Sequence, residues 1–204
     1  TCYMFNHRPN SLNAGSLWGR PFYILREAWN ILNAIAEGKI ESGDEKKLNA
    51  LKGETMAVIA LCQFDLTRCF GYPYTKDKGA SLGAPLIDHL VGTYENPPRS
   101  TVAQAYDFII ETLEEAVTLM SEEKNNGRMN KYAARALLAR IYLYHDDNRK
   151  AFDLADQLIK DADTSGSYAL YPHEKYVAAW SVEAKFGSES FFEIANSVDD
   201  TPGR

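Results

Sequence analysis

Residues 53–74, GETMAVIALCQFDLTRCFGYPY, decide the fold of this chain. Apolar and small side chains recur on two sides of the helix that this stretch predicts, and such a helix lies between other helices. Gly71 and Pro73 then end the helix. We therefore expect an all-α fold, in the main, built in layers. The residues of the two sides are Ala57, Ala60, Leu61 and Phe64, and Ile59, Cys62, Leu66 and Cys69.

Residues 127–151, GRMNKYAARALLARIYLYHDDNRKA, predict a second central helix over about 130–144. Asp147 or Asn148 begins the next helix after a short turn, so the two helices should be antiparallel neighbours. Their spacing is typical of the tetratricopeptide repeat, in which helix pairs stack because each pair has too much apolar surface to stand alone. The matching positions are Leu138, Ala139, Tyr142 and Ala151.

Two more helices are expected beside these. Pro21 is well placed in a first helical turn, and apolar residues recur at helical spacing from there to Gly38. Thr101 and Gln104 have the spacing of a capping box, which satisfies the free N–H groups at a helix start. An unbroken apolar stripe follows to Met120, so this helix should cover one side of a core.

The chain divides into three expected parts. Residues 1–16 lack apolar periodicity and predict an irregular lead-in, residues 17–163 the tetratricopeptide-like scaffold, and residues 164–204 a loop-rich segment. Residues 71–100 form a long insertion loop in the scaffold, and loops of that length usually carry function. Ser190–Asn196, SFFEIAN, predicts a short strand. Because a lone strand needs a partner, we expect the fold to continue beyond this sequence.

Composition and charge narrow the possible partners. The 204 residues are 45% hydrophobic, enough for a substantial core, and their formal net charge is −6. No lysine or arginine run exceeds a pair, so no phosphate backbone would be attracted and nucleic acid is not an expected partner. The longest apolar run, Met56–Cys62, is far shorter than the ~20 residues that span a bilayer. Membrane contact would therefore need an anchor outside this chain.

No constellation of residues predicts catalysis, a metal site or a cofactor. The four histidines are scattered without a second ligand at metal-binding spacing. Adjacent glutamates on a helix point ~100° apart and do not converge on a substrate. Cys62 and Cys69 lie ~10.5 Å apart along one helix, too far for a disulfide, and are expected to pack. We expect a protein that is not an enzyme.

Several blocks of residues resemble the SusD/RagB-like proteins, a family of surface glycan-binding lipoproteins from the outer membrane of Bacteroidetes. The resemblance covers roughly residues 15–196. It rests on Trp29 with Asn30, on Gly53-Glu54 through Phe64-Asp65-Leu66, Arg68, Phe70-Gly71 and Pro73, on Ser100, Val102, Tyr106 and Ile109, on the block Gly127–Leu143, and on Glu189 with Phe192-Glu193-Ile194.

This resemblance implies a function and a location. It implies a helical half whose loops bind an oligosaccharide, docked on a TonB-dependent outer-membrane transporter of the SusC-like kind that imports the captured sugar. It also implies a surface-exposed place on the outer membrane through a lipid anchor, which is not in this sequence. The chain lacks the longer loop-rich C-terminal part of the family.

Aromatic side chains outside the helical stripes are the candidate sugar contacts. Sugars lay their apolar ring faces on aromatic side chains, and a ring in a loop or at the end of an element can face water. We predict that Trp18 with Asn13, or Tyr72 with Tyr74, forms a glycan platform, and that Trp180 also contributes. The alternative is that each ring packs on the helices beneath it.

Two other functions are possible on the same sequence. A tetratricopeptide-type scaffold can bind a peptide or protein in its concave groove, and this is the main alternative. A glycosidase would need two carboxylates about 5–9.5 Å apart across a cleft, and the sequence shows no such pairing.

Overall fold

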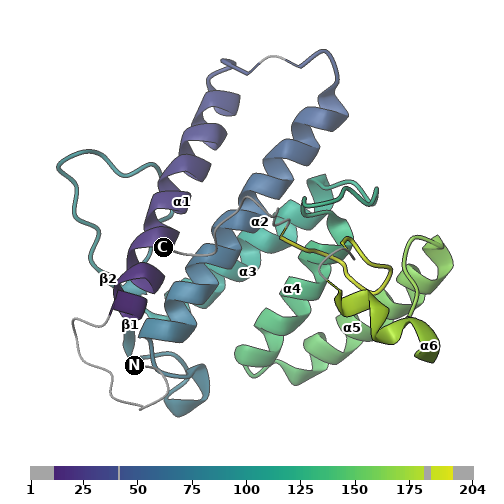
Figure 1. The fold of residues 1–204 in the computed structure, drawn as a ribbon. Helices are drawn as coiled ribbons and strands as arrows, with labels where there is room; N and C mark the ends of the chain where they lie inside the picture. Colours follow the sequence, from purple (N-terminus) through teal and green to yellow (C-terminus); the bar gives the residue numbers. More distant parts are fainter. Residues whose placement is uncertain (1–11, 41, 182–184, 195–204) are drawn as a thin grey trace.

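The computed structural model describes residues 12–40, 42–181 and 185–194 as a mainly helical protein (Figure 1). The predicted fold class is confirmed, since one helix follows another along most of these residues. In chain order the elements are α1 (Leu12–Ala36), α2 (Glu45–Phe70), the 3-10 turn η2 (Tyr74–Lys76), β1 (Leu82–Pro85), β2 (Arg99–Thr101), α3 (Val102–Leu119), α4 (Lys131–Tyr144), α5 (Asn148–Ser165), α6 (His173–Tyr176) and the 3-10 turn η3 (Ala178–Trp180).

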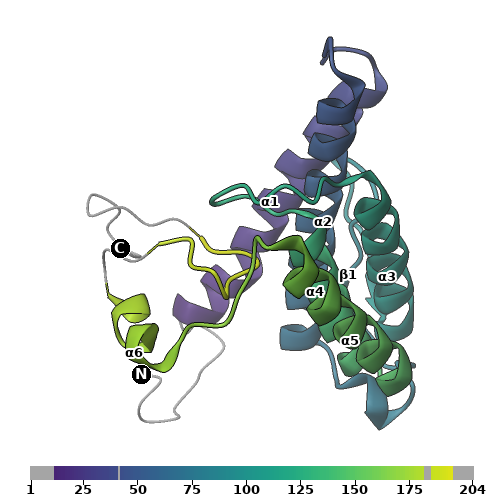
Figure 2. The ribbon, with the colours of Figure 1, turned by 90° about the vertical axis from the view of Figure 1, so that its right-hand side faces the viewer.

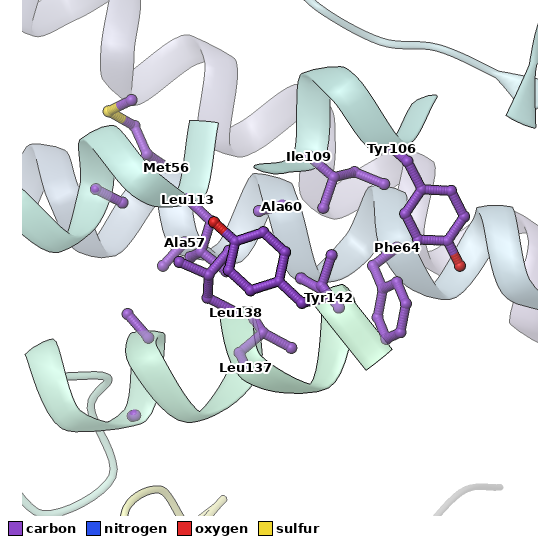
Figure 3. Close-up of a cluster of buried hydrophobic side chains, with 14 of the residues drawn as sticks. Met56, Ala57, Ala60, Phe64, Tyr106, Ile109, Leu113, Leu137, Leu138 and Tyr142 are labelled. Atoms are coloured by element: carbon purple, nitrogen blue, oxygen red, sulfur yellow. The ribbon is translucent and has the colours of Figure 1, made fainter. Parts of the chain in front are cut away.

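Helix α2 lies in the middle of the stack, as its two apolar sides predict. Ala57, Ala60 and Phe64 join the largest buried cluster, which α3 and α4 complete (Figure 3). Ile59 and Cys62 belong to a second buried cluster that faces α1. The exception is Cys69, which was expected to pack but is exposed at the end of the helix. The order of layers is therefore α1, α2, then α3 with α4, with α5 outside α4.

Helices α2 and α3 approach each other closely at Gly53. A Cβ at this position would lie 2.7 Å from the Cγ of Met120 and 2.9 Å from the carbonyl oxygen of Ala116, both at the end of α3. No side chain fits there without movement of the backbone. The glycine that opens the fold-determining stretch therefore sets the spacing of α2 and α3.

Helices α4 and α5 form the predicted antiparallel hairpin (Figure 1). Asp147 caps α5, its carboxylate accepting from the backbone N–H of Lys150 at 3.3 Å. Among the positions that match the tetratricopeptide spacing, Leu138, Tyr142 and Ala151 are buried. The capping box of Thr101 and Gln104 is likewise present at the start of α3.

Residues 71–100 are more ordered than the sequence predicts. The antiparallel pair β1–β2 aligns Leu82 with Thr101 and Pro85 with Arg99. We missed it because strands of four and three residues are too short for alternation to show. Gln63 of α2 anchors the segment, donating from its Nε2 to Pro85 O at 3.1 Å and accepting from Ile87 N at its Oε1 at 3.3 Å.

Two predictions from the sequence are wrong, the start of the first helix and a strand near residue 190. Helix α1 begins at Leu12, so residues 12–16 are helical and Pro21 lies inside the helix. An interior proline removes one N–H, which costs one hydrogen bond but does not end a helix whose other face is packed. Residues 190–194 have no strand conformation in the described part of the chain, where the sheet consists of β1 and β2. Asn196 and residues 1–11 lie outside the described part of the chain.

Candidate functional site

Trp18 lies on the first turns of α1 and is 39% exposed. Its indole packs edge-on against Phe22 of the same helix and Phe70 at the end of α2, with ring centroids 5.0 and 4.8 Å away. The remaining surface of the ring faces solvent. Asn13 belongs to the same helix, and its side chain lies outside the part of the chain that the structure describes.

Tyr72 and Tyr74 have different environments. Tyr72 is 57% exposed, and the ammonium of Lys76 lies 3.1 Å from its ring centroid. Tyr74 is half-buried and packs against Tyr106 and His145, with ring centroids 5.7 and 4.2 Å apart. The two rings do not form one flat platform. Tyr74 takes part in the core, and Tyr72 offers its surface near the end of α2 that Trp18 also covers.

The third aromatic candidate, Trp180, borders a cleft of about 400 Å³. Its indole is 76% exposed and contacts only the edge of Tyr176, 6.1 Å away, among the described rings. The cleft belongs to the segment after α5, which projects away from the helix stack around α6 (Figure 2). It is lined by Tyr171, Ala179, Trp180, Ser181, Gly187, Glu189, Ser190 and Glu193.

Two carboxylates in the lining of this cleft accept hydrogen bonds from backbone N–H groups. Glu193 accepts hydrogen bonds from the backbone N–H groups of Phe186 at 2.6 Å and Gly187 at 2.9 Å. Glu189 accepts from the N–H of Tyr171 at 2.5 Å. The Ser190 hydroxyl, with these backbone donors and nearby Lys124, holds the pKa of Glu193 below its usual value. Glu193 is therefore charged at neutral pH.

Gly187 lets two parts of the cleft wall, its own segment and Tyr171, pack closely together. A Cβ at this position would lie 1.5 Å from the hydroxyl of Tyr171, so a larger residue would require the Tyr171 ring to move. Lys124 donates from its Nζ to the carbonyl of Gly187 at 2.7 Å and links the wall to the α3–α4 connection. The cleft is thus a built feature, held by contacts between segments far apart in the sequence.

Aromatic packing fixes the base of the cleft segment on the helix hairpin. Tyr168 packs against Tyr132 of α4 and Phe191, with ring centroids 5.1 and 4.8 Å apart. Its hydroxyl accepts from the side-chain amide of Asn130 at 2.7 Å. The loop-rich segment is therefore tied to α4 at the residues that begin that helix.

Sequence reasoning identified one residue of the cleft and missed the others. Trp180 was a candidate because of its place at the end of an element. Tyr171, Glu189 and Glu193 were not. Glu189 and Glu193 did appear among the family-like residues, but nothing in the sequence shows that they line one cleft with Trp180, which precedes them by nine and thirteen residues.

Two more hollows lie on the helix stack. A groove of about 640 Å³ runs between the start of α2 and the α3–α4 connection and is lined by charged groups that include Lys46, Glu54 and Arg128. An apolar hollow of about 290 Å³ follows α1 and α2 at Ile24, Ile31 and Val58. Within the described ranges, no set of three or more His, Cys, Asp or Glu side chains could hold a metal ion. None of the described helices is both long and apolar enough to cross a membrane.

Fold and surface together define a class of protein: a tetratricopeptide-like helical scaffold with exposed aromatic rings in its loops and at element ends. The comparisons agree with that class. Residues 5–143 match a SusD-like family described as starch-binding and associating with the outer membrane. The chain belongs to this SusD-like family. Among curated proteins, none matches the chain.

Solved structures from the same superfamily share this fold. A SusD superfamily protein of Bacteroides thetaiotaomicron is 40% identical, with a TM-score of 0.81 over 87% of this chain and 38% of that one. A Bacteroides vulgatus protein, provisionally named a sugar-binding protein, is 38% identical, with a TM-score of 0.84 over 92% of this chain and 42% of that one. A laminarin-binding SusD-like protein is 22% identical, with a TM-score of 0.67 over 87% of this chain and 36% of that one. The chain thus spans about two fifths of the length of these proteins.

Proposed function

We propose that this chain is the helical part of a cell-surface glycan-binding subunit of a nutrient-uptake complex. The observation that carries the proposal is the match of residues 5–143 to a family described as starch-binding and associating with the outer membrane. The names of two similar proteins, one for sugar and one for laminarin, point the same way. The ligand would be an oligosaccharide.

Exposed aromatic rings are the proposed sugar contacts. Trp18, Tyr72 and Trp180 each present a large part of their ring to solvent. A sugar can lay its C–H face on such a ring with little loss of conformational freedom, because an aromatic side chain has only two torsions. Asn13 remains a proposed hydroxyl partner by its position on α1. Tyr74 is a weaker candidate, because its ring already packs against Tyr106 and His145.

The proposed partner is a SusC-like TonB-dependent transporter. Family membership supports it, because an outer-membrane protein that captures sugars needs a route for them across that membrane. We place the protein at the cell surface, attached through a lipid anchor outside this chain. Co-purification of the complete protein with its transporter from detergent-solubilised membranes tests this assembly, and consistent separation of the two would contradict it.

We propose binding without turnover. A glycosidase needs a general acid whose pKa is raised so that it stays protonated near neutral pH. Glu193 in the Trp180 cleft has the opposite character, because the Ser190 hydroxyl and the backbone N–H groups of Phe186 and Gly187 lower its pKa. Neither the cleft nor the proposed function calls for a cofactor.

Calorimetry with a panel of oligosaccharides tests the binding function. We expect heat from at least one sugar and a weaker affinity in Trp18→Ala or Tyr72→Ala if that ring is a contact. Tyr94→Ala is the matched control, because this ring is 96% exposed and lies in the β1–β2 loop, which contains none of the three candidate rings. Absence of heat from every sugar would contradict the proposal.

A peptide-binding scaffold is the second candidate, and one observation favours it. The hollow along α1 and α2 is lined by apolar side chains, as helical grooves that take peptides are. The same calorimetry separates the two functions, because peptide binding alone would give no heat with any sugar and would not depend on Trp18.

A further inference from the structure

The cleft beside Trp180 combines the chemistry of a sugar site in one place. One large ring lies open to solvent, with Tyr176 packed on its edge to orient it. The same cleft is also lined by the hydroxyl-bearing residues Ser181 and Ser190 and by the carboxylate-bearing residues Glu189 and Glu193. Its volume, about 400 Å³, falls within the range of about 300–1,000 Å³ that is usual for small-ligand sites.

The charge of the lining is uneven. Glu189 and Glu193 are both acidic, and among the described residues of the lining there is no lysine, arginine or histidine. Lys124 donates to the carbonyl of Gly187 and lowers the pKa of Glu193, but it is not part of the lining. The described lining itself therefore carries two acidic side chains and no basic one.

An acidic cleft selects among sugars. A carboxylate accepts hydrogen bonds from sugar hydroxyls, and such charge-assisted bonds are stronger than neutral ones. The same carboxylate repels a uronate or a sulfate group, and the repulsion grows where water is partly excluded. Like charges brought together are an effective means of rejecting a wrong ligand.

We propose that this cleft is a carbohydrate subsite for uncharged sugar units, in which Trp180 stacks on the sugar ring and Glu189 accepts from its hydroxyls. The inference rests on the proposed glycan-binding function and adds to it a place and a class of ligand. Glu193 and Gly187 shape the wall. Trp18 and Tyr72 lie on the helix stack and would form a separate contact with the glycan.

Competing ligand panels on the 204-residue chain test the subsite. The neutral probes are hexasaccharides of α- and β-linked glucose, of mannose and of galactose, and the anionic probes are oligogalacturonates of the same length. Isothermal calorimetry measures affinity, and the shift of tryptophan emission reports on stacking. We expect at least one neutral hexasaccharide to bind and the oligogalacturonates to bind about tenfold more weakly or not at all.

Variants assign the binding to the cleft. Trp180→Ala should weaken binding of the neutral sugar about tenfold or more, and Trp180→Phe should restore part of it because a ring returns. Glu189→Gln keeps an oxygen for the N–H of Tyr171 but removes the charge, so it should narrow the gap between neutral and anionic sugars. Tyr94→Ala, at a 96% exposed ring outside the cleft, is the matched control and should leave binding of the neutral sugar unchanged. Circular dichroism confirms that each variant is folded.

The outcomes separate this inference from the function on which it rests. If a neutral sugar binds and Trp180→Ala binds it equally well, the subsite is overturned and glycan binding stands. If oligogalacturonates bind as tightly as the neutral sugars through Trp180, the ligand class is overturned. If no sugar of either kind binds, the proposed glycan-binding function is contradicted, and the subsite with it.

Discussion

Glu54, in the middle of α2, pairs with Arg128, 74 residues later in the α3–α4 connection, with 2.9 Å between Oε2 and Nε. The same carboxylate accepts from the backbone N–H of Met129 at 3.1 Å. One side chain thus positions the residues that lead into α4. Both residues lie in the blocks that resemble the family, and the structure gives a physical reason for their presence there.

Replacement of Glu54 should loosen this connection. Glu54→Leu removes the acceptor for Arg128 and leaves the N–H of Met129 without its partner, so we expect a loss of about 1–3 kcal/mol in the free energy of unfolding. Glu54→Gln retains an oxygen and should lose less. Urea unfolding measures both, and a double-mutant cycle with Arg128→Ala isolates the pair. A cycle with no interaction energy would show that the ion pair contributes nothing.

Gly53→Ala should destabilise the stack. The added methyl group would meet Met120 and the carbonyl of Ala116 at the α2–α3 contact, and overpacking of this kind costs about 1–3 kcal/mol. Gly19→Ala is the matched control, because nothing lies within 4 Å of a Cβ at that position of α1. There alanine should stabilise by up to about 1 kcal/mol. Thermal melts of the two variants should therefore shift in opposite directions, and equal shifts would contradict the close approach.

Gln63→Leu should release the segment after β1. The buried amide of Gln63 satisfies Pro85 O and Ile87 N, and leucine has nearly the same size but no polar atoms. We expect a loss of about 1–3 kcal/mol for each group left unpaired. Hydrogen exchange at the amide of Ile87 should accelerate in this variant more than at the core of α3. Gln157→Leu, on the exposed face of α5, should change neither.

His89 should titrate above the ordinary histidine range. Its Nδ1 lies 2.6 Å from Asp88 and its Nε2 2.7 Å from Glu95, and these two hydrogen bonds raise the pKa of His89 from 6.5. A raised pKa in the folded state means that the contribution to loop stability is complete below the unfolded pKa and is lost as pH rises through the folded one. NMR titration measures this pKa. Asp88→Asn and Glu95→Gln should each lower it, and no change in either variant would contradict the arrangement.

The two described cysteines should differ in reactivity. Burial raises the pKa of Cys62 to about 12, and Cys69 is exposed. Because the thiolate is the reactive form, iodoacetamide at pH 8 should modify Cys69 and spare Cys62. Peptide mapping by mass spectrometry identifies the labelled residue, and labelling in guanidinium should reach both. Rapid modification of Cys62 in the folded protein would show that α1 and α2 separate in solution.

Apolar periodicity predicted the helices, but it predicted neither the residue at which α1 begins nor the β1–β2 pair. The two apolar sides of α2 did face two different clusters, and Thr101 did cap α3. The start of α1 was misplaced, because proline is favoured in a first helical turn, whereas Pro21 lies inside α1 and removes one backbone hydrogen bond there. The β1–β2 pair could not be seen, since its stability comes from backbone hydrogen bonds between residues about 16 apart and from the anchor at Gln63.

The candidate site was predictable only in part. Exposed aromatic rings could be chosen from their places between elements, and Trp18, Tyr72 and Trp180 are indeed exposed. Whether two rings share a surface depends on the direction of each side chain, and Tyr74 turned into the core. For the same reason the sequence did not single out Glu189 and Glu193. They line one cleft with Trp180 in a segment that Tyr168 and Lys124 attach to the rest of the protein.

By itself the sequence determined the helical class and its central helices, because apolar periodicity and caps act over a few residues and are read along the chain; its motif blocks indicated the family. The tertiary structure alone decided which distant groups bind one another, as Glu54 binds Arg128 and Gln63 binds Ile87, and which side chains line the cleft beside Trp180. Those meetings depend on how every helix packs on its neighbours. A contact between residues far apart in sequence leaves no local pattern, so only the assembled fold reveals it.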